Sequence, residues 1–384
     1  MKHSTRIRLG VGAIGVATAL VLSGCASGGG TSDSTPSSGG KLTPITLQLQ
    51  WVAQAQFAGY YAAVDQGFYK KEGLDVTIKQ AGTTTVPIDV LAAGDADYAI
   101  SWVPKVLGSI EQGTNVTDVA QIFERSGTTQ ISFKDKDITS AADLKGKKVG
   151  SWGYGNQWEL FAGMQKSGID TTSQIKLVQQ AFDMNGFLAG DIDAAQAMTY
   201  NEYAQVLETV NPSTGKLYQP DELNVINWND EGTAMLQDAI WADADKLASD
   251  KTYAANTEKF VKASIEGWVY TRDHPQDAAD IVAKAGSTLP AGHQLWMTNE
   301  VNKLIWPSTS GIGVIQKKAW DQTVKIALGT KDDTGSTIIT TKPPATAYSN
   351  KYVEQALKEL KAEGVDVLGT SFTPLTVTLK EGGK

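Results

Sequence analysis

Residues 45–51 read Ile-Thr-Leu-Gln-Leu-Gln-Trp, and apolar and polar side chains alternate over the whole stretch. A period of two is typical of a β-strand with one buried face. A helical stretch near 56–66 and a second strand at 75–80 follow, with breakers at Gly67 and Gly73 between them. The order strand, helix, strand predicts a parallel sheet in an α/β protein.

The same alternation continues beyond the second strand. We expect helices at 86–93 and 105–112 and strands at 98–101 and 116–123, which together make one open α/β lobe. A second lobe is expected to begin with a capped helical turn near 140–146, followed by a strand at 148–152. From about residue 240 to 329 the pattern is helical, with helices expected at 253–274, 277–285, 292–304 and 317–328.

An internal repeat supports two similar lobes. The segment LAAGDADYA at 91–99 is matched by FLAGDIDAA at 187–195. Each copy predicts a helix that ends at a glycine, a short acidic turn and a strand of small residues that leads to an aromatic, Trp102 or Tyr200. Chance similarity between two helix–turn–strand corners is the alternative interpretation.

The amino-terminal segment predicts export and lipidation. Lys2, Arg6 and Arg8 precede an apolar run at 9–22, which is too short to span a bilayer and is typical of a signal peptide. The run ends in Leu-Ser-Gly-Cys25, which resembles the bacterial lipoprotein box. We therefore expect cleavage before Cys25 and attachment of a lipid, with palmitate among its acyl chains, to the new terminal cysteine. An ordinary signal peptide with a chance cysteine is the alternative. The Gly- and Ser-rich composition of the segment after Cys25 predicts a flexible tether.

The boundaries predicted from these patterns divide the chain into six segments. Crossovers near 134–140 and 236–242 are the expected hinges between the lobes. The segments are a lipoprotein signal peptide at 1–24, the lipidated cysteine and tether at 25–43, the first part of lobe 1 at 44–135, lobe 2 at 136–238, the helical second part of lobe 1 at 239–340, and a carboxy-terminal helix with an extended tail at 341–384.

Composition and motifs exclude several classes of function. The chain has 34 basic and 42 acidic residues and a net charge of -8, the wrong sign for binding nucleic acid through its phosphates. The single cysteine excludes disulfides and thiolate metal sites within the chain. No HExxH motif, phosphate loop or nucleophile elbow occurs, so we expect neither a metal site nor a cofactor.

Aromatic residues follow the expected strands of both lobes. Ligands of open α/β sheets bind beyond the carboxyl ends of the strands, and planar side chains there suit a flat aromatic ligand. Hinge packing is the alternative role of these aromatics. Glu202 and Asp230 are expected to accept hydrogen bonds from an amino group of the ligand. The alternative for Glu202 is a position in the first turn of a helix, and the alternative for Asp230 is a solvent-exposed turn. The strand-end aromatics are Trp51, Trp102, Trp152, Tyr200 and Trp228, with Tyr154 and Trp158 close behind Trp152.

Several of these stretches resemble the thiamine-pyrimidine-synthase-like family of solute-binding proteins, over about residues 44–330. The resemblance implies a two-lobed, type II periplasmic-binding-protein fold with a ligand cleft between the lobes. The matching motifs are LQW at 49–51, AQFAGYYAA at 55–63, GFY at 67–69, EGLDV at 72–76 and DLKGK at 143–147. The ligand-binding positions that it implies are Trp51, Gln54, Gln56, Tyr60, Trp102, Tyr154, Asn156, Tyr200, Asn201 and Glu202.

The resemblance also implies a function. Bacterial relatives are receptors of ABC importers that bind thiamine pyrimidine precursors, riboflavin or small sulfonates. Fungal relatives are synthases that use a lysine-bound pyridoxal phosphate, a histidine and a cysteine-rich iron motif. This chain lacks that cysteine run, and it has no histidine between Pro44 and Arg272. We therefore expect a binding protein and no enzyme, while synthase activity and sulfonate binding remain the alternatives.

The expected receptor is a monomer on the extracytoplasmic face of the cell membrane, held there by its lipid anchor. Its partners are a small solute and the permease of an ABC transporter, and no nucleic acid. The stretches 51–61, 102, 151–159, 199–203 and 227–232 contain no Lys or Arg. This composition favours a neutral or weakly cationic heteroaromatic ligand, with a thiamine pyrimidine precursor first and riboflavin second.

Overall fold

The first lobe is built on a five-stranded sheet whose order is β2-β1-β3-β12-β4. β1, β2 and β3 are parallel to one another, and β12 runs antiparallel between β3 and β4. The alternation at 45–51 thus marks the first of several parallel strands. The strands are β1 (Thr43–Gln48), β2 (Leu74–Lys79), β3 (Tyr98–Trp102), β4 (Val116–Gln121) and β12 (Asp238–Asp243).

The computed structural model describes residues 41–384. The predicted signal peptide at 1–24, Cys25 and the tether up to residue 40 lie outside the described residues. In the part of the chain that the structure describes, no helix is long and apolar enough to cross a membrane.

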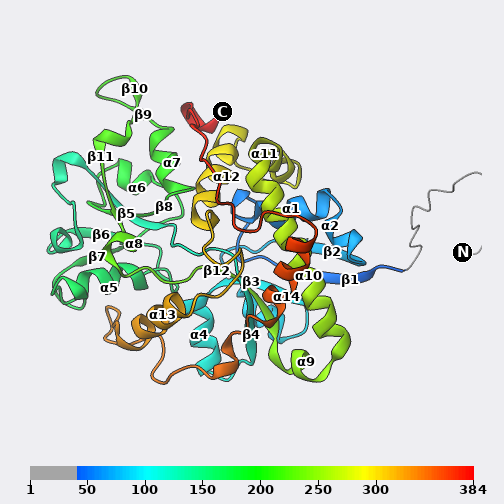
Figure 1. Ribbon diagram of the computed structural model, residues 1–384. Helices are drawn as coiled ribbons and strands as arrows, with labels where there is room; N and C mark the ends of the chain where they lie inside the picture. Colours follow the sequence, from blue (N-terminus) through cyan, green and yellow to red (C-terminus); the bar gives the residue numbers. More distant parts are fainter. Residues whose placement is uncertain (1–40) are drawn as a thin grey trace, which may run out of the picture. The chain divides into compact units, whose positions relative to one another are not determined.

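The second lobe contains a three-stranded sheet, β11-β5-β8, and a parallel pair, β6-β7. A parallel bridge between Val149 and Ala194 joins the pair to the start of β8. Figure 1 shows this group on the left and the five-stranded sheet on the right. The strands are β5 (Thr128–Phe133), β6 (Lys148–Ser151), β7 (Lys176–Gln179), β8 (Ala195–Met198) and β11 (Leu223–Asn227), with a small hairpin of β9 (Val210–Asn211) and β10 (Lys216–Leu217) beside them.

The two repeated segments occupy equivalent corners of the two lobes. Gly94 and Gly190 both take the left-handed conformation, with φ of 80° and 81°. Asp97 accepts a hydrogen bond from Thr46 N at 2.7 Å, and its own N donates to Thr46 O at 2.9 Å. Asp193 makes the same two bonds to Lys148, both at 2.9 Å. In each lobe, therefore, the acidic turn connects the corner to the first parallel strand, which supports a structural repeat.

Helices of the first lobe cover its sheet and come from both ends of the chain. α1 packs along α10, and α14 packs on the other side of α10. The ranges of α1, α3, α4 and α10 to α13 agree with the sequence-based expectations to within three residues at either end, whereas α2 and α9 were not predicted. The helices are α1 (Ala58–Asp65), α2 (Phe68–Lys71), α3 (Pro87–Ala92), α4 (Val103–Glu111), α9 (Ala244–Ser249), α10 (Lys251–Asp273), α11 (Pro275–Lys284), α12 (Ala291–Ile305), α13 (Lys317–Gly329) and α14 (Lys351–Ala362).

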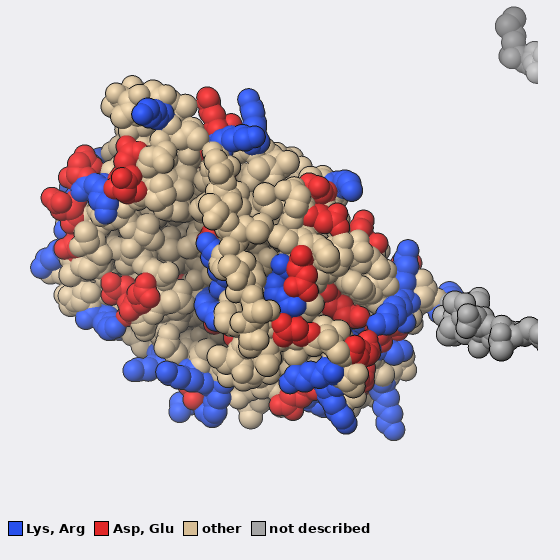
Figure 2. Space-filling model, turned by 45° about the horizontal axis from the view of Figure 1, so that its top comes forward, with Lys and Arg blue, Asp and Glu red and all other residues tan. Residues whose placement is uncertain are grey.

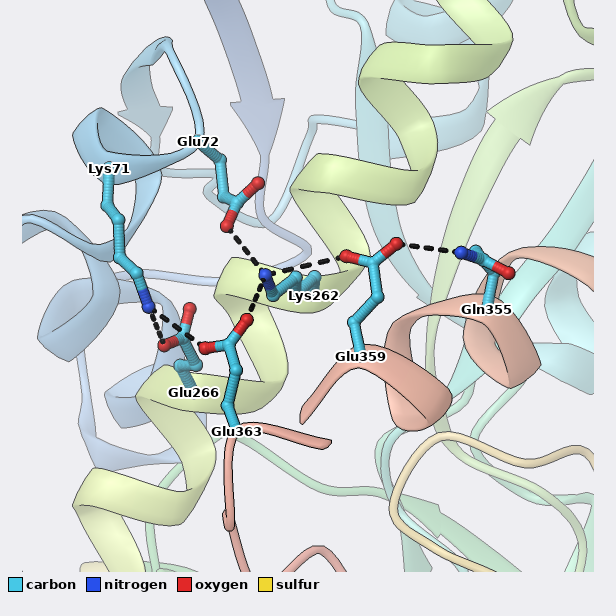
Figure 3. Close-up of polar contacts among 7 residues, drawn as sticks. All are labelled: Lys71, Glu72, Lys262, Glu266, Gln355, Glu359 and Glu363. Atoms are coloured by element: carbon cyan, nitrogen blue, oxygen red, sulfur yellow. Dashed lines mark hydrogen bonds and ion pairs between the residues drawn. The ribbon is translucent and has the colours of Figure 1, made fainter. Parts of the chain in front are cut away.

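Ion pairs join α14 to α10 and α2 (Figure 3). Lys262 Nζ lies 3.0 Å from a Glu72 oxygen, 3.4 Å from a Glu359 oxygen and 2.6 Å from a Glu363 oxygen. Lys71 pairs with Glu266 and with Glu363, both at 3.1 Å. These contacts link residues nearly three hundred positions apart on the surface of lobe 1.

The helices of the second lobe are short. A 3₁₀ turn at Ala141–Leu144 opens its helical part and has the capping box expected there, because Ser140 and Asp143 bond each other's backbone N–H groups. The carboxy-terminal tail extends from lobe 1 to this lobe, where Gly382 N donates to Glu208 O at 3.0 Å. The helices are α5 (Trp158–Lys166), α6 (Asn185–Leu188), α7 (Glu202–Leu207) and α8 (Trp228–Glu231).

The chain passes from lobe to lobe earlier than the sequence suggested. β4 pairs in the first sheet and β5 in the second, so the first crossing lies at 122–127 and not at 134–140. The second crossing lies at 232–237, between α8 of the second lobe and β12 of the first, and not at 236–242. β5 reads TTQISF and has no clear apolar alternation, but its buried polar side chains are bonded: Gln130 Nε2 donates to Ala194 O at 2.7 Å.

Charged side chains are intermixed on the surface. On the face of residues 41–384 shown in Figure 2, Lys and Arg side chains lie between Asp and Glu side chains, and neither positive nor negative charge dominates that face.

Candidate ligand cleft

A cleft of about 1050 Å³ lies where the carboxyl ends of the strands of the two lobes meet. Its volume is at the upper end of the range that small-molecule sites occupy. Segments from both lobes line it: 50–56, 82–88, 101–109, 152–158, 179–182, 198–202 and 337–338 contribute most of its wall.

Most of the predicted binding residues line this cleft. Tyr60 and Asp230 do not. Tyr60 is 1% exposed and packs edge-on against Trp268 in the core of lobe 1, with ring centroids 5.6 Å apart. Asp230 is exposed on the outer surface of α8. The predicted residues that line the cleft are Trp51, Gln54, Gln56, Trp102, Tyr154, Asn156, Tyr200, Asn201 and Glu202.

The aromatic lining differs from the expected row of strand-end platforms. Trp228 is fully buried in the core of lobe 2, against Gly163, and does not line the cleft. Trp102, Trp152 and Tyr200 reach the cleft but are buried over most of their surface. The strand ends at 51, 102, 152 and 200 thus lie in segments that meet the cleft, whereas the predicted stretch at 227–232 does not, and the direction of each ring is decided by packing.

Phe182 completes an aromatic group that the sequence analysis missed. It follows β7 and is 40% exposed. Its ring centroid lies 4.8 Å from that of Trp51, at an interplanar angle of 49°, and 6.3 Å from that of Trp152 in a stacked arrangement. Because Trp51 belongs to lobe 1 and Phe182 to lobe 2, this pair crosses the cleft. The sequence predicted no strand at 176–179, and Phe182 lies three residues beyond the end of β7.

Tyr154 presents the most exposed aromatic ring at the cleft. It is 82% exposed and has a φ of 52°, a left-handed conformation that is rare outside glycine. Gly153 and Gly155 on either side are also left-handed, and Asn156 closes the turn by donating from Nδ2 to Gly153 O at 2.7 Å. Backbone strain of this kind is concentrated at functional sites.

Asp238, on β12, orders the floor of the cleft. Its Oδ1 accepts from Trp102 Nε1 and from Gln50 Nε2, both at 2.7 Å, and its Oδ2 accepts from Gln56 Nε2 at 2.9 Å. Burial raises the pKa of Asp238 to about 6, although these three donors lower it. Gln54 Nε2 donates in turn to Gln56 Oε1 at 2.7 Å. The sequence analysis placed Asp238 at a domain boundary and missed this role.

Glu202 lies in the first turn of α7, the position given above as the alternative to a role as ligand acceptor, and both of its oxygens already accept hydrogen bonds. Oε2 accepts from Met198 N at 2.9 Å and Oε1 from Asn201 Nδ2 at 2.8 Å. Burial raises the pKa of Glu202 to about 7. Near neutral pH the carboxyl group can therefore donate or accept a further bond at the cleft.

Lys105 overturns the expectation of a cleft without basic residues. It is in the first turn of α4, three residues after Trp102, and it lines the cleft. Its Nζ lies 4.9 Å from the Trp102 ring centroid. Burial lowers the pKa of Lys105 to about 8, although Asp238 raises it. The site stretches inspected in the sequence ended at the strand terminus and so excluded it.

Glu159, on α5, binds both segments that connect the lobes. Its Oε2 accepts from Ser126 Oγ at 2.8 Å, and Ser126 lies in the first crossing. Its Oε1 accepts from Met235 N at 2.6 Å, and Met235 lies in the second crossing. Burial raises the pKa of Glu159 to about 7. One buried carboxyl group thus holds the two crossings together.

Comparisons with known proteins identify relatives by sequence. The formylaminopyrimidine-binding protein of Halalkalibacterium halodurans is 24% identical over 247 residues, 63% of this chain and 70% of that protein. The riboflavin-binding protein RibY of Chloroflexus aurantiacus is 25% identical over 268 residues, 65% of this chain and 69% of RibY. A 4-amino-5-hydroxymethyl-2-methylpyrimidine phosphate synthase of Aspergillus parasiticus is 24% identical over 220 residues, 57% of this chain and 63% of the synthase.

Solved structures share the fold. The aliphatic sulphonate binding protein SsuA of Escherichia coli superposes with a TM-score of 0.54 at 14% identity, covering 88% of this chain and 94% of SsuA. The nitrate-binding protein NrtA of Synechocystis PCC 6803 gives 0.52 at 14%, covering 86% and 92%. The fold is therefore the two-lobed, type II fold of periplasmic solute-binding proteins, as the sequence predicted. The family model described as NMT1/THI5 like matches residues 54–278, more than half of the sequence, and the chain belongs to this family.

Proposed function

We propose that this protein is the solute-binding component of an ABC importer and that its cleft captures a flat heteroaromatic solute. The observation that carries the proposal is the aromatic pair of Trp51 and Phe182, which meets across a large cleft between two lobes. A planar ring inserted beside this pair would be in contact with both lobes at once, which is how a solute stabilises a closed form.

A thiamine pyrimidine precursor is the first candidate ligand and riboflavin the second. The names of two sequence relatives, a formylaminopyrimidine-binding protein and a riboflavin-binding protein, support this choice. Glu202 and Gln54 offer polar partners for an amino group of the ring, and Trp51, Phe182 and Tyr154 offer aromatic surface. The cleft volume leaves room for a ring system larger than one pyrimidine.

A receptor for small sulfonates is a second candidate, and Lys105 is the observation that favours it. A sulfonate is the less favoured ligand because two carboxyl groups, Glu202 at the cleft and Asp238 beneath it, disfavour an anion.

Synthase activity is the alternative from another class, because some relatives are named as pyrimidine phosphate synthases. Among the described residues that line the cleft there is one lysine, and there is no histidine or cysteine. This lining favours capture over chemical conversion. Incubation of the purified protein with each candidate solute, with and without pyridoxal phosphate, followed by mass spectrometry, tests the proposal. We expect every solute to be recovered unchanged, and turnover would favour the enzyme.

Acylation of Cys25 would place the receptor on the extracytoplasmic face of the cell membrane, as a monomer next to its permease. Cys25→Ser is expected to release the protein into the soluble fraction with unchanged solute affinity. Membrane association of that variant, or an unmodified Cys25 in the wild type, would contradict this part of the proposal.

A further inference from the structure

Lys105 is a cation in the cleft that no protein group neutralises by direct contact. Among the described residues of the lining it is the only lysine or arginine. Its ammonium group faces the ring of Trp102 and makes no hydrogen bond or ion pair with any residue of 41–384. Because the Lys105 side chain is only partly buried, its ammonium group is open to the cleft, where a ligand that supplies an acceptor would be stabilised by it.

Both lobes surround this side chain. Its own helix, α4, follows the first-lobe strand β3. From the second lobe, Gly155 approaches the stem so closely that a Cβ on Gly155 would lie 3.2 Å from Lys105 Cγ. Lys105 therefore lies where the two lobes approach each other at the cleft.

The surrounding charges decide which kind of acceptor suits Lys105. Asp238, which accepts from Trp102 Nε1 at 2.7 Å beneath the lining, is the carboxyl group that acts on Lys105, and the other titratable groups of the lining are Glu202, Tyr154 and Tyr200. Asp238 offsets the charge of Lys105, and Glu202 with a pKa of about 7 is partly ionised near neutral pH, so the cleft offers a fully charged anion little net attraction. An uncharged carbonyl oxygen gains the hydrogen bond and needs no such attraction.

We propose that Lys105 determines ligand specificity by donating a hydrogen bond to an uncharged carbonyl oxygen carried by the heteroaromatic ligand. The inference rests on the proposed function and specifies its ligand class. A formyl oxygen on a pyrimidine and a ring carbonyl of a flavin are both uncharged carbonyl acceptors. The experiment has to distinguish which of these two ligands supplies the carbonyl oxygen.

Calorimetric titrations of three proteins test the assignment: wild type, Lys105→Met, which keeps the length of the stem, and Lys318→Met as an exposed control on α13. The probes are formylaminopyrimidine, the same pyrimidine without its formyl group, riboflavin and an alkylsulfonate. In wild type and in Lys318→Met we expect the carbonyl-bearing ligand to bind at least about tenfold more tightly than its carbonyl-free counterpart.

In Lys105→Met this preference should fall to within about twofold, while the affinity for the carbonyl-free pyrimidine stays the same or rises. If riboflavin alone binds, the source is the ring carbonyl, and Lys105→Met should weaken it at least about tenfold. A preference or a riboflavin affinity that Lys105→Met leaves unchanged would overturn the Lys105 assignment and leave the proposed function intact.

Two further outcomes separate the claims. Sulfonate binding that depends on Lys105, without binding of any heteroaromatic probe, would overturn both the carbonyl assignment and the proposed ligand class. Binding of only the carbonyl-free pyrimidine, equal in all three proteins, would support the proposed function and overturn the role of Lys105.

Discussion

The ring of Phe182, in the second lobe, lies 4.8 Å from the ring of Trp51, in the first lobe, measured between centroids. Trp152 stacks behind Phe182 at 6.3 Å, so the ring of Phe182 is supported from its own lobe while it touches the other. The contact joins the lobes on one side of the cleft, and a ligand that stacks there would strengthen it.

Phe182→Ala should weaken solute binding by about 2- to 12-fold, because an aromatic contact contributes about 0.5–1.5 kcal/mol. It should also reduce the compaction that small-angle scattering detects when solute is added. Leu177→Ala, at an exposed position on β7 outside the cleft lining, is the control. Equal affinities of both variants and wild type would contradict a role for the pair.

The stability of the fold should fall as the pH rises from 5 to 8. Burial raises the pKa of Glu159 from 4.5 to about 7, so the folded state binds this proton more tightly than the unfolded state does. The stabilising contribution is complete below about pH 4.5 and is lost as the pH rises through about 7. Asp238 and Glu202 act in the same direction.

Urea unfolding of wild type and Glu159→Gln at pH 5 and pH 8 checks this. A glutamine cannot ionise. The change in the free energy of unfolding between pH 5 and pH 8 should therefore be about 1–3 kcal/mol smaller in the variant than in wild type. Identical differences in the two proteins would show that Glu159 does not titrate in this range.

Lys262→Met should destabilise the fold by about 1–2 kcal/mol. The Lys262 side chain is 8% exposed, and its removal leaves Glu72, Glu359 and Glu363 without their shared cation (Figure 3). Breaking a buried pair costs about 3–5 kcal/mol, and solvent exposure of Glu359 and Glu363 reduces that value here.

Lys317→Met is the matched control for this cluster. Lys317 pairs with Asp321 on the surface of α13, with both side chains largely exposed. Its removal should change the free energy of unfolding by less than about 0.5 kcal/mol. Equal losses in the two lysine variants, by chemical denaturation, would disprove the contribution of the Lys262 cluster.

Gly267→Ala should be strongly destabilising. An added Cβ at this position of α10 would lie 2.0 Å from Gly59 O, in the AQFAGYYAA motif on α1. The two helices would have to separate, at a cost of about 2–4 kcal/mol. Gly329→Ala at the end of α13, where an added Cβ meets open space, should leave the melting temperature within a few degrees of wild type. Similar melting temperatures for both variants would rule out a close contact of α1 and α10.

The sequence predicted elements whose apolar spacing is regular. The alternation at 45–51 and the spacing of Val353, Ala356, Leu357 and Leu360 each correspond to an observed element, because one face of each is buried. β5 was missed because most of its buried side chains are polar and donate to groups around the strand, for example Thr129 Oγ1 to Ala197 O at 2.8 Å. Such a strand has no hydrophobic period to detect.

The sequence predicted the position of the cleft better than it predicted which side chains line it. Strand ends located the segments that meet there, but they did not say that Trp228 turns into the core and Lys105 toward the cleft. Side-chain direction at a strand end depends on packing partners that are distant in sequence, such as Gly163 for Trp228. Lys105 and Phe182 lie a few residues beyond their strands, where a rule based on the last strand residue does not reach.

The central claim is that the cleft captures a flat heteroaromatic solute, and calorimetric titration of the purified protein at pH 7 tests it most directly. Formylaminopyrimidine, riboflavin and an alkylsulfonate would be titrated separately under identical conditions. The account predicts one-to-one binding of the pyrimidine or of riboflavin, with a dissociation constant of about 1 μM or below and no measurable heat from the sulfonate. Tight binding of the sulfonate, with no binding of either ring compound, would contradict it.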